Sequence, residues 1–125
     1  FCNPDSVPGA DAYYPVPMAE LANQFKITRQ TFLVVTSRGS GGDAAGLPPL
    51  LESNAAYIGV IGSKRRWLTT VKALKERGVS DELIARVHSP MGIELNAETP
   101  EEIAVSIMAE ILMLRDKGTG KMMKD

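Results

Sequence analysis

The sequence predicts a three-layer α/β domain in which a parallel sheet carries helices on both faces. The order of strand, glycine-containing turn and helix occurs twice along the chain. Both predicted strands, residues 31–36 and 57–61, are apolar throughout, which is typical of strands covered on two sides. With 125 residues, 44% hydrophobic and 23% charged, the chain has the size and composition of one globular unit. We therefore expect a single domain over residues 1–125.

The N-terminal part predicts irregular chain followed by a short helix, a strand and a second short helix. Residues 3–17 hold four prolines, with a turn expected at Pro8-Gly9. A helical spacing of apolar residues follows at Met18, Leu21, Ala22 and Phe25. The strand 31–36 comes next and ends in a glycine-rich loop over residues 37–42. Leucines 47, 50 and 51 suggest another helix, but Pro48 and Pro49 restrict its start to their own position.

The C-terminal part predicts three helices with defined ends. The first begins after Gly62-Ser63, ends at Gly78 and has one apolar stripe, formed by Trp67, Leu68, Val71 and Leu74. A brief helix capped by Ser80 runs through Val87, and residues 88–96 form a loop or a short strand. The last helix has Thr99 as its cap, Pro100 at its first position and Glu102 to complete a capping box.

This last helix is apolar on almost every face from residue 103 to residue 114, interrupted by Ser106 and Glu110. Such a helix requires cover, either within the domain or across an oligomer interface. The segment is too short to cross a bilayer. The charged, glycine-containing residues 116–125 are expected to fray.

Charge and cysteine content exclude several classes of function. Fourteen basic and fifteen acidic residues give a net charge of -1, so no global field attracts nucleic acid or an anionic membrane, and an anion site must be local. Cys2 is the only cysteine, which excludes an internal disulfide and a multi-thiolate metal site. A reducing, cytoplasmic location is the simplest interpretation.

The strongest local signal is the segment Gly62-Ser63-Lys64-Arg65-Arg66, where three cations occupy the start of a helix. Cations oppose the helix dipole there at a cost of roughly 0.3 to 1 kcal/mol each. A bound phosphate or carboxylate would reverse this effect, because the free amides of a first helical turn attract anions. Adjacent helical residues diverge by about 100°, so at most two of the three cations contact one ligand. The alternative is that all three are solvated surface charges.

The loop Arg38-Gly39-Ser40-Gly41-Gly42-Asp43 also follows a strand, and its glycines would let the backbone approach a ligand. It matches neither a Walker loop nor G-x-G-x-x-G. Flexible linkage is the alternative interpretation.

His88 is the only histidine, which makes it a poor metal-site candidate. It could donate a proton or a hydrogen bond to a ligand, because imidazole titrates near neutral pH, although a structural role is favoured. No G-x-S-x-G elbow accompanies the serines, so the sequence does not support a hydrolase. We assign no catalytic residue and no metal ligand.

Taken together, several ordered motifs resemble the XdhC family of xanthine dehydrogenase accessory proteins. The matching segments are Phe1-Cys-Asn-Pro4, Pro8-Gly-Ala-Asp11 and residues 56–66, 78–83, 87–93 and 97–107. The resemblance covers nearly the whole chain. It implies the C-terminal, Rossmann-like domain of such a protein, here lacking the first strand-helix unit and the cysteine-bearing N-terminal domain of many relatives.

The resemblance also implies a function. Members of the family are thought to bind molybdenum cofactor, promote its sulfuration and deliver it to a molybdenum hydroxylase apoenzyme. The phosphate of molybdopterin suits Gly62, Ser63, Lys64, Arg65 and Arg66. On this interpretation the loop residues Arg38, Gly39, Ser40 and Asp43 lie beside the phosphate, and His88, Pro90 and Gly92 form a wall. Relatives usually carry a histidine in the pattern Thr-Arg-Gly-His-x-x-Asp, where this chain has Ser40.

Two other functions stay open. The domain could bind NAD(P) as an oxidoreductase, although fold alone does not imply that chemistry. It could also be an interaction module that uses residues 103–114 to dimerise or to dock a client enzyme. We favour a non-catalytic accessory role with a homodimer, a hydroxylase client, and neither nucleic acid nor membrane as a partner.

Overall fold

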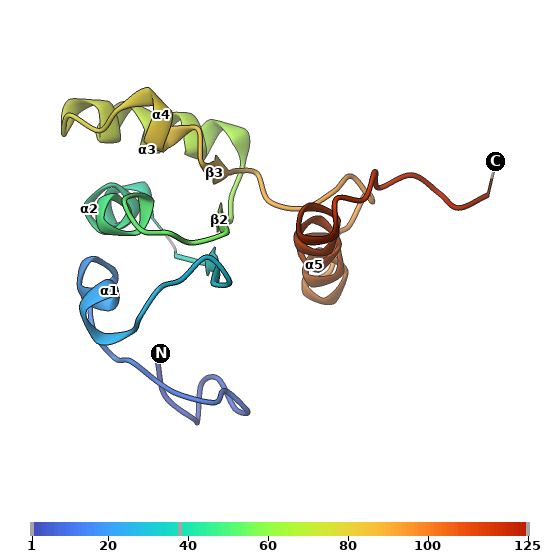
Figure 1. Cartoon of the computed structure of the whole chain (residues 1–125), viewed down its shortest axis with the longest axis horizontal. Coiled ribbons are helices and arrows are strands. Elements are labelled where there is room, and N and C mark those ends of the chain that lie inside the picture. Colours follow the sequence, from blue (N-terminus) through green and yellow to red (C-terminus); the bar gives the residue numbers. More distant parts are fainter. Residues whose placement is uncertain (1, 38, 125) are drawn as a thin grey trace.

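The computed structural model describes residues 2–37 and 39–124, with the backbone alone at residues 40 and 41 (Figure 1). Three strands form one sheet in the order β1 (Phe32–Val35), β2 (Tyr57–Val60) and β3 (Val87–His88). Both pairings are parallel, with Phe32 opposite Tyr57 and Gly59 opposite His88. The predicted parallel α/β sheet is therefore confirmed.

The helices follow the predicted order along the chain. They are the 3-10 helix η1 (Met18–Glu20) and the α-helices α1 (Leu21–Gln24), α2 (Ser40–Leu51), α3 (Lys64–Glu76), α4 (Asp81–Ile84) and α5 (Pro100–Asp116). Residues 3–9 form turns, with Gly9 at a φ of 87°. Residues 118–124 form neither helix nor strand. No helix in the described ranges combines the length and apolarity needed to span a bilayer.

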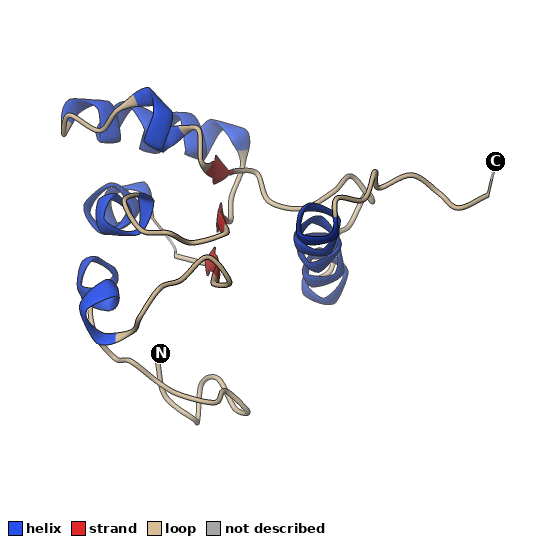
Figure 2. Ribbon diagram, in the orientation of Figure 1, coloured by secondary structure: helices blue, strands red, loops and turns tan. Residues whose placement is uncertain are grey.

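Successive residues of β2 face opposite layers of the domain. Ile58 and Val60 join a buried cluster with side chains of α2 and α3, whereas Tyr57 packs against Ile107 and Ile111 of α5. Figure 2 shows α1, α2 and α3 on one side of the strands and α5 on the other. The sheet therefore carries helices on both faces, as predicted.

The α5 side of the sheet is less completely covered than the apolar strands predict. Phe32 packs into the cluster beneath α5, but Val34, two residues further along β1, is 43% exposed. A single helix on this face leaves the end of β1 open. The expectation of a doubly covered first strand is therefore wrong at Val34.

The prolines do not stop α2, and this corrects the sequence prediction. The helix begins at Ser40, within the predicted glycine loop, and runs through Pro48 and Pro49 to Leu51. Leu47, Leu50 and Leu51 are at most 1% exposed. Burying each leucine contributes roughly 1.5 to 3 kcal/mol, and the fixed φ of proline is itself helical, so tertiary packing overrides the breaker signal.

The end of α2 is fixed by an arginine from the segment before β3. The guanidinium of Arg86 donates to the carbonyls of Leu51, Ser53 and Ala55, with distances of 2.7 Å to the last two. These carbonyls belong to the last residue of α2 and the turn that follows it, where helical partners are missing. Arg86 therefore connects the residues just before β3 to the residues just before β2.

Helix α3 follows its predicted boundaries but not its full predicted stripe. Ser63 caps it, and Gly78 lies just beyond its end at a φ of 83°. Trp67, Val71 and Leu74 pack against the core, whereas Leu68 is 57% exposed. Thr70 is fully buried on this helix instead, and its hydroxyl is satisfied there because it donates to the carbonyl of Arg66 at 3.2 Å.

The remaining helices show how local signals set their ends. Ser80 caps α4, but α4 ends at Ile84 rather than at the predicted Val87, because Val87 begins β3. Both hydrogen bonds of the Thr99–Glu102 capping box are present at the start of α5. Helix α5 buries Ser106, Ile107 and Ile111, while its outer face is exposed.

Candidate functional site

The carboxyl ends of the three parallel strands place three loops along one edge of the sheet. The loops lead from β1 to α2, from β2 to α3, and from β3 towards α5. Ser89, which follows β3, donates from its hydroxyl to the carbonyl of Val60 at the end of β2, at 2.8 Å. This bond fixes the third loop beside the second.

The start of α3 has the geometry of an anion-accepting helix terminus. The Ser63 hydroxyl accepts from the backbone N–H of Arg66 at 3.1 Å. The amides of Lys64 and Arg65 precede that bond and have no intrahelical acceptor, so they point out of the helix. Both side chains are exposed, and no ion pair within the described residues involves either one. Two amides and two cations are therefore available to one ligand.

Arg66 has a different partner. Its Nη2 donates to Asp43 Oδ2 at 3.0 Å, to the Ser37 carbonyl at 2.9 Å and to Ser37 Oγ at 3.3 Å. The Ser37 hydroxyl in turn donates to Asp43, whose side chain is 0% exposed. Arg66 Nε is buried with no partner among the described residues, so the guanidinium is held through Nη2. The charge of Arg66 is thus used inside the domain, to join α3 to α2.

Gly62 makes this arrangement possible. Its φ of 132° is one that residues with a Cβ rarely adopt, and a Cβ would lie 3.0 Å from Arg66 Cδ. The glycine therefore has a packing role towards Arg66 beside any role towards a ligand.

The structure describes only part of the loop after β1. Arg38 lies outside the described residues, and the side chain of Ser40 is not described. Gly39 is the extended N-cap of α2, with a φ of -150°. Asp43 lies in the first turn of α2 and is fully buried against Arg66 and Ser37. Its contacts with those two residues hold the fold together.

A second polar cluster, which sequence reasoning missed, lies on the other face of the sheet. The Tyr57 hydroxyl donates to Glu110 Oε1 at 2.5 Å, and the backbone N–H of Gly92 donates to the same oxygen at 3.2 Å. The other carboxylate oxygen, Oε2, lies 3.8 Å from Nδ1 of His88. Burial, reinforced by the hydrogen bond and charge of Glu110, raises the pKa of the Tyr57 hydroxyl above its ordinary value. The sequence feature that could have indicated this cluster is the single carboxylate, Glu110, in an otherwise apolar helix face.

An aromatic stack supports this cluster from β1 to β3. The Tyr57 ring lies 6.2 Å from the Phe32 ring and 5.0 Å from the His88 ring, stacked on both. Gly59, opposite His88, gives Tyr57 its space: a Cβ there would lie 2.5 Å from the Tyr57 hydroxyl and 2.5 Å from Met91 Cε. An absent side chain on β2 thus lets Tyr57 reach Glu110.

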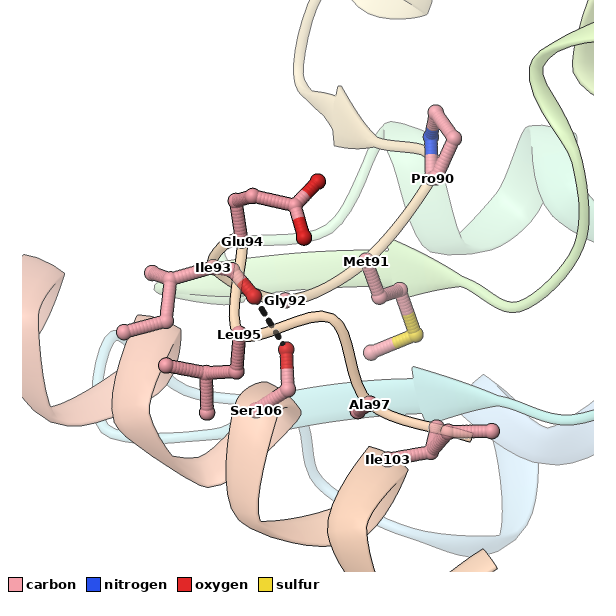
Figure 3. Close-up of a pocket in the computed structure, with 9 residues that line it drawn as sticks. All are labelled: Pro90, Met91, Gly92, Ile93, Glu94, Leu95, Ala97, Ile103 and Ser106. Carbon is pink, nitrogen blue, oxygen red and sulfur yellow. Dashed lines mark hydrogen bonds between the residues drawn. The ribbon is translucent and has the colours of Figure 1, made fainter. Parts of the chain in front are cut away.

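Pro90 and Gly92 line a pocket of about 310 Å³ between the third loop and α5 (Figure 3). Ser106 donates from its hydroxyl to the Ile93 carbonyl at 2.6 Å, and the backbone N–H of Ile93 donates to the Ser106 carbonyl at 3.3 Å. The lining is completed by Met91, Ile93, Glu94, Leu95, Ala97, Ile103 and Ser106. The pocket thus opens on the α5 side and does not include the start of α3.

A parallel sheet with helices on both faces, a glycine turn and a serine-capped helix at its carboxyl edge defines a Rossmann-type α/β domain. The sequence profile of the XdhC Rossmann domain matches residues 1–111. The chain therefore belongs to the XdhC Rossmann domain family, which confirms the resemblance seen in the sequence.

Relatives with assigned names are consistent with this membership. The chain is 41% identical over 81 residues to the uncharacterised protein YqeB of Escherichia coli K12, covering 65% of this chain and 15% of that protein. It is 29% identical over 117 residues to a probable xanthine dehydrogenase subunit of Bacillus subtilis 168, covering 94% of this chain and 33% of that protein.

A solved structure extends the match to the fold. A protein described as a xanthine dehydrogenase from Bacillus halodurans superposes with a TM-score of 0.73 at 31% identity, covering 94% of this chain and 33% of that one. The chain thus spans a third or less of the length of these relatives.

Proposed function

We propose that this domain binds molybdenum cofactor, through its phosphate, for insertion into a molybdenum hydroxylase of the xanthine dehydrogenase type. The observation that carries the proposal is the start of α3, where Ser63 caps the helix and leaves two amides and two exposed cations at the carboxyl edge of the sheet. Membership of the XdhC family supports the proposal, because proteins of that family are expected to handle molybdenum cofactor.

The donors at this edge fit a phosphate group. Outward backbone N–H groups at a helix start accept anions without any reorganisation of the chain. Lys64 and Arg65 would add two charges, and an anion there removes their unfavourable interaction with the helix dipole. Arg66, committed to Asp43, would hold the terminus in place rather than contact the ligand.

The test compares two pairs of cations, one at the start of α3 and one towards its end. Lys64→Ala with Arg65→Ala removes the proposed contacts, whereas Lys72→Ala with Arg77→Ala removes two exposed cations away from the helix start. The probe is molybdenum cofactor released anaerobically from a purified molybdenum hydroxylase, measured by equilibrium dialysis with pterin fluorescence. Hydrogen bonds to charged groups contribute roughly 1.5 to 3 kcal/mol, so the first pair should weaken binding roughly tenfold or more.

Equal affinity of the two double variants would reject the anion site. A parallel titration with NADH addresses the dinucleotide alternative: tight NADH binding, lost with Lys64 and Arg65, would favour an oxidoreductase-like role over cofactor delivery.

A second function is favoured by the outer face of α5. Val105, Met108 and Leu112 are 61%, 53% and 44% exposed and recur at helical spacing. An exposed apolar stripe of this kind marks an interaction surface. We propose that it forms the homodimer contact of the domain, with the client hydroxylase as the competing occupant.

A further inference from the structure

We propose that His88 is a proton-accepting group at the carboxyl end of β3, and that Glu110 and Tyr57 are positioning residues that fix its tautomer. This inference goes beyond cofactor binding. It assigns proton transfer to a group outside the start of α3, and it holds whichever anion occupies that helix terminus.

The hydrogen bonds of Glu110 orient its carboxylate. Oε1 accepts from both the Tyr57 hydroxyl, at 2.5 Å, and the Gly92 backbone N–H, at 3.2 Å. Oε2 is left facing His88 Nδ1 at 3.8 Å, and the Glu110 side chain is only 12% exposed. Because both donors bind the same oxygen, the second oxygen is directed at the imidazole.

Tyr57 acts as a permanent donor in this arrangement. Its raised pKa, caused by burial and by the Glu110 carboxylate, keeps the hydroxyl protonated at ordinary pH. The stacked Tyr57 ring also limits the rotation of the His88 ring beside it, at 5.0 Å and an interplanar angle of 16°. Tyr57 from β2 and Glu110 from α5 therefore control the orientation of His88 from two different layers.

His88 is open to solvent. Its side chain is 39% exposed, and within the described chain neither ring nitrogen has a hydrogen-bond partner or is sealed from solvent. A neutral imidazole with its proton on Nδ1, facing Glu110, presents a bare lone pair at Nε2. The separation of 3.8 Å is longer than a hydrogen bond, and such contacts tighten when a ligand binds.

The proton transfer balances within these groups. A ligand O–H, S–H or ring N–H gives its proton to Nε2 and keeps the bonding electron pair, so the ligand becomes an anion. The imidazole becomes an imidazolium, and the Glu110 carboxylate stabilises its charge. The site therefore suits a ligand that carries an enol, a thiol or an acidic ring N–H.

The position of the proton on the imidazole is the first test, and His88 is the only histidine to observe. Long-range ¹H–¹⁵N NMR of the full chain should show the Nδ1–H tautomer. In Glu110→Gln, the amide oxygen takes over the bonds from Tyr57 and Gly92, which turns the NH₂ group towards Nδ1. An NH₂ donor there requires a bare Nδ1, so the proton should move to Nε2.

The matched control is Glu94→Gln, the same substitution in the loop between β3 and α5, at an exposed carboxylate that accepts from the Asn96 backbone N–H. It should leave the tautomer unchanged. Glu110→Gln should melt near the wild-type temperature, because its two hydrogen bonds from Tyr57 and Gly92 are retained. An Nε2–H tautomer in the wild type, or an unchanged tautomer in Glu110→Gln, overturns the proposal.

The second test measures whether Nε2 reacts as a base. Diethylpyrocarbonate acylates a bare imidazole nitrogen, and the absorbance change reports His88 alone. Acylation should be faster in the wild type and in Glu94→Gln than in Glu110→Gln. Equal rates in all three would overturn the proton-accepting role. Neither test uses the cofactor. A failure of cofactor binding can therefore be distinguished from a failure of this proposal.

Discussion

Arg66 of α3 and Asp43 of α2 form an ion pair of 3.0 Å that joins the first turns of two helices on the same face of the sheet. The two residues are not equally buried: the Arg66 side chain is 24% exposed, whereas that of Asp43 is 0% exposed. The cost of removing one partner therefore depends on which charge is left behind.

We expect Arg66→Ala to destabilise the domain more than Asp43→Ala. Removing Arg66 leaves a fully buried carboxylate whose remaining side-chain partner among the described residues is Ser37, a situation that costs about 3 to 5 kcal/mol. Removing Asp43 leaves a guanidinium that reaches solvent and still binds the Ser37 carbonyl, at a cost of about 1.5 to 3 kcal/mol. Urea unfolding of both variants measures the order, and Arg65→Ala, exposed on the same turn, should change stability little. A larger loss of stability in Asp43→Ala than in Arg66→Ala would contradict the conclusion that Asp43 is the more deeply buried partner.

We expect Gly59→Ala to displace the Tyr57 ring. The new Cβ would lie 2.5 Å from the Tyr57 hydroxyl, and overpacking of this kind costs about 1 to 3 kcal/mol. The near-UV circular dichroism of tyrosine should change with the loss of stability. Gly42→Ala is the control, because no described atom outside its own helix backbone and chain neighbours lies within 4 Å of its Cβ position. A stable variant with an unchanged tyrosine signal would show that Tyr57 does not depend on Gly59.

We expect the start of α5 to weaken in acid. Hydrogen bonds from the backbone N–H groups of Glu98 and Thr99 lower the pKa of Glu102. A carboxyl whose pKa is lower in the folded state adds stability above its unfolded-state pKa and loses it as pH falls through the folded pKa. The melting temperature of Glu102→Gln should therefore lie below wild type at neutral pH and approach it in acid. Glu101→Gln, in the same turn, should show a smaller difference; a gap that stays constant with pH would contradict the capping role.

We expect Met108→Glu to convert a dimer into a monomer. The substitution places a charge in the middle of the exposed stripe formed by Val105, Met108 and Leu112. Sedimentation analysis over a range of concentrations measures the change. Leu68→Glu, at a leucine that is 57% exposed on α3, should leave the dimer intact. A wild-type protein that is monomeric throughout would reject the homodimer.

Features of the fold set by short-range bonds could be predicted from the sequence. Ser63, Ser80 and Thr99 each accept from a backbone N–H three residues later, so a few letters contain the whole signal. Helix α2 could not be predicted in the same way. Its leucines pack against the sheet, and this long-range burial outweighs the local effect of Pro48 and Pro49.

The same distinction between short-range and long-range contacts applies to the candidate site. The start of α3 was visible because glycine, serine and cations follow one another directly. Arg66 looked like a ligand contact because its partner, Asp43, lies on another helix. The cluster around Glu110 was missed because Tyr57 and Glu110 are 53 positions apart, and only the folded sheet brings them together.

The side-chain bonds between the third loop and α5, from Ser106 to Ile93 and from Gly92 to Glu110, lie on the inner face of the helix, while its apolar stripe lies on the outer face. Helix α5 therefore carries both the exposed apolar stripe and the carboxylate that faces the imidazole. A partner that shifts this helix would also shift Glu110, and by thermodynamic reciprocity a ligand proton taken up by His88 would change the affinity for that partner. We expect the proposed ligand release and the proposed partner recognition to be coupled through this helix.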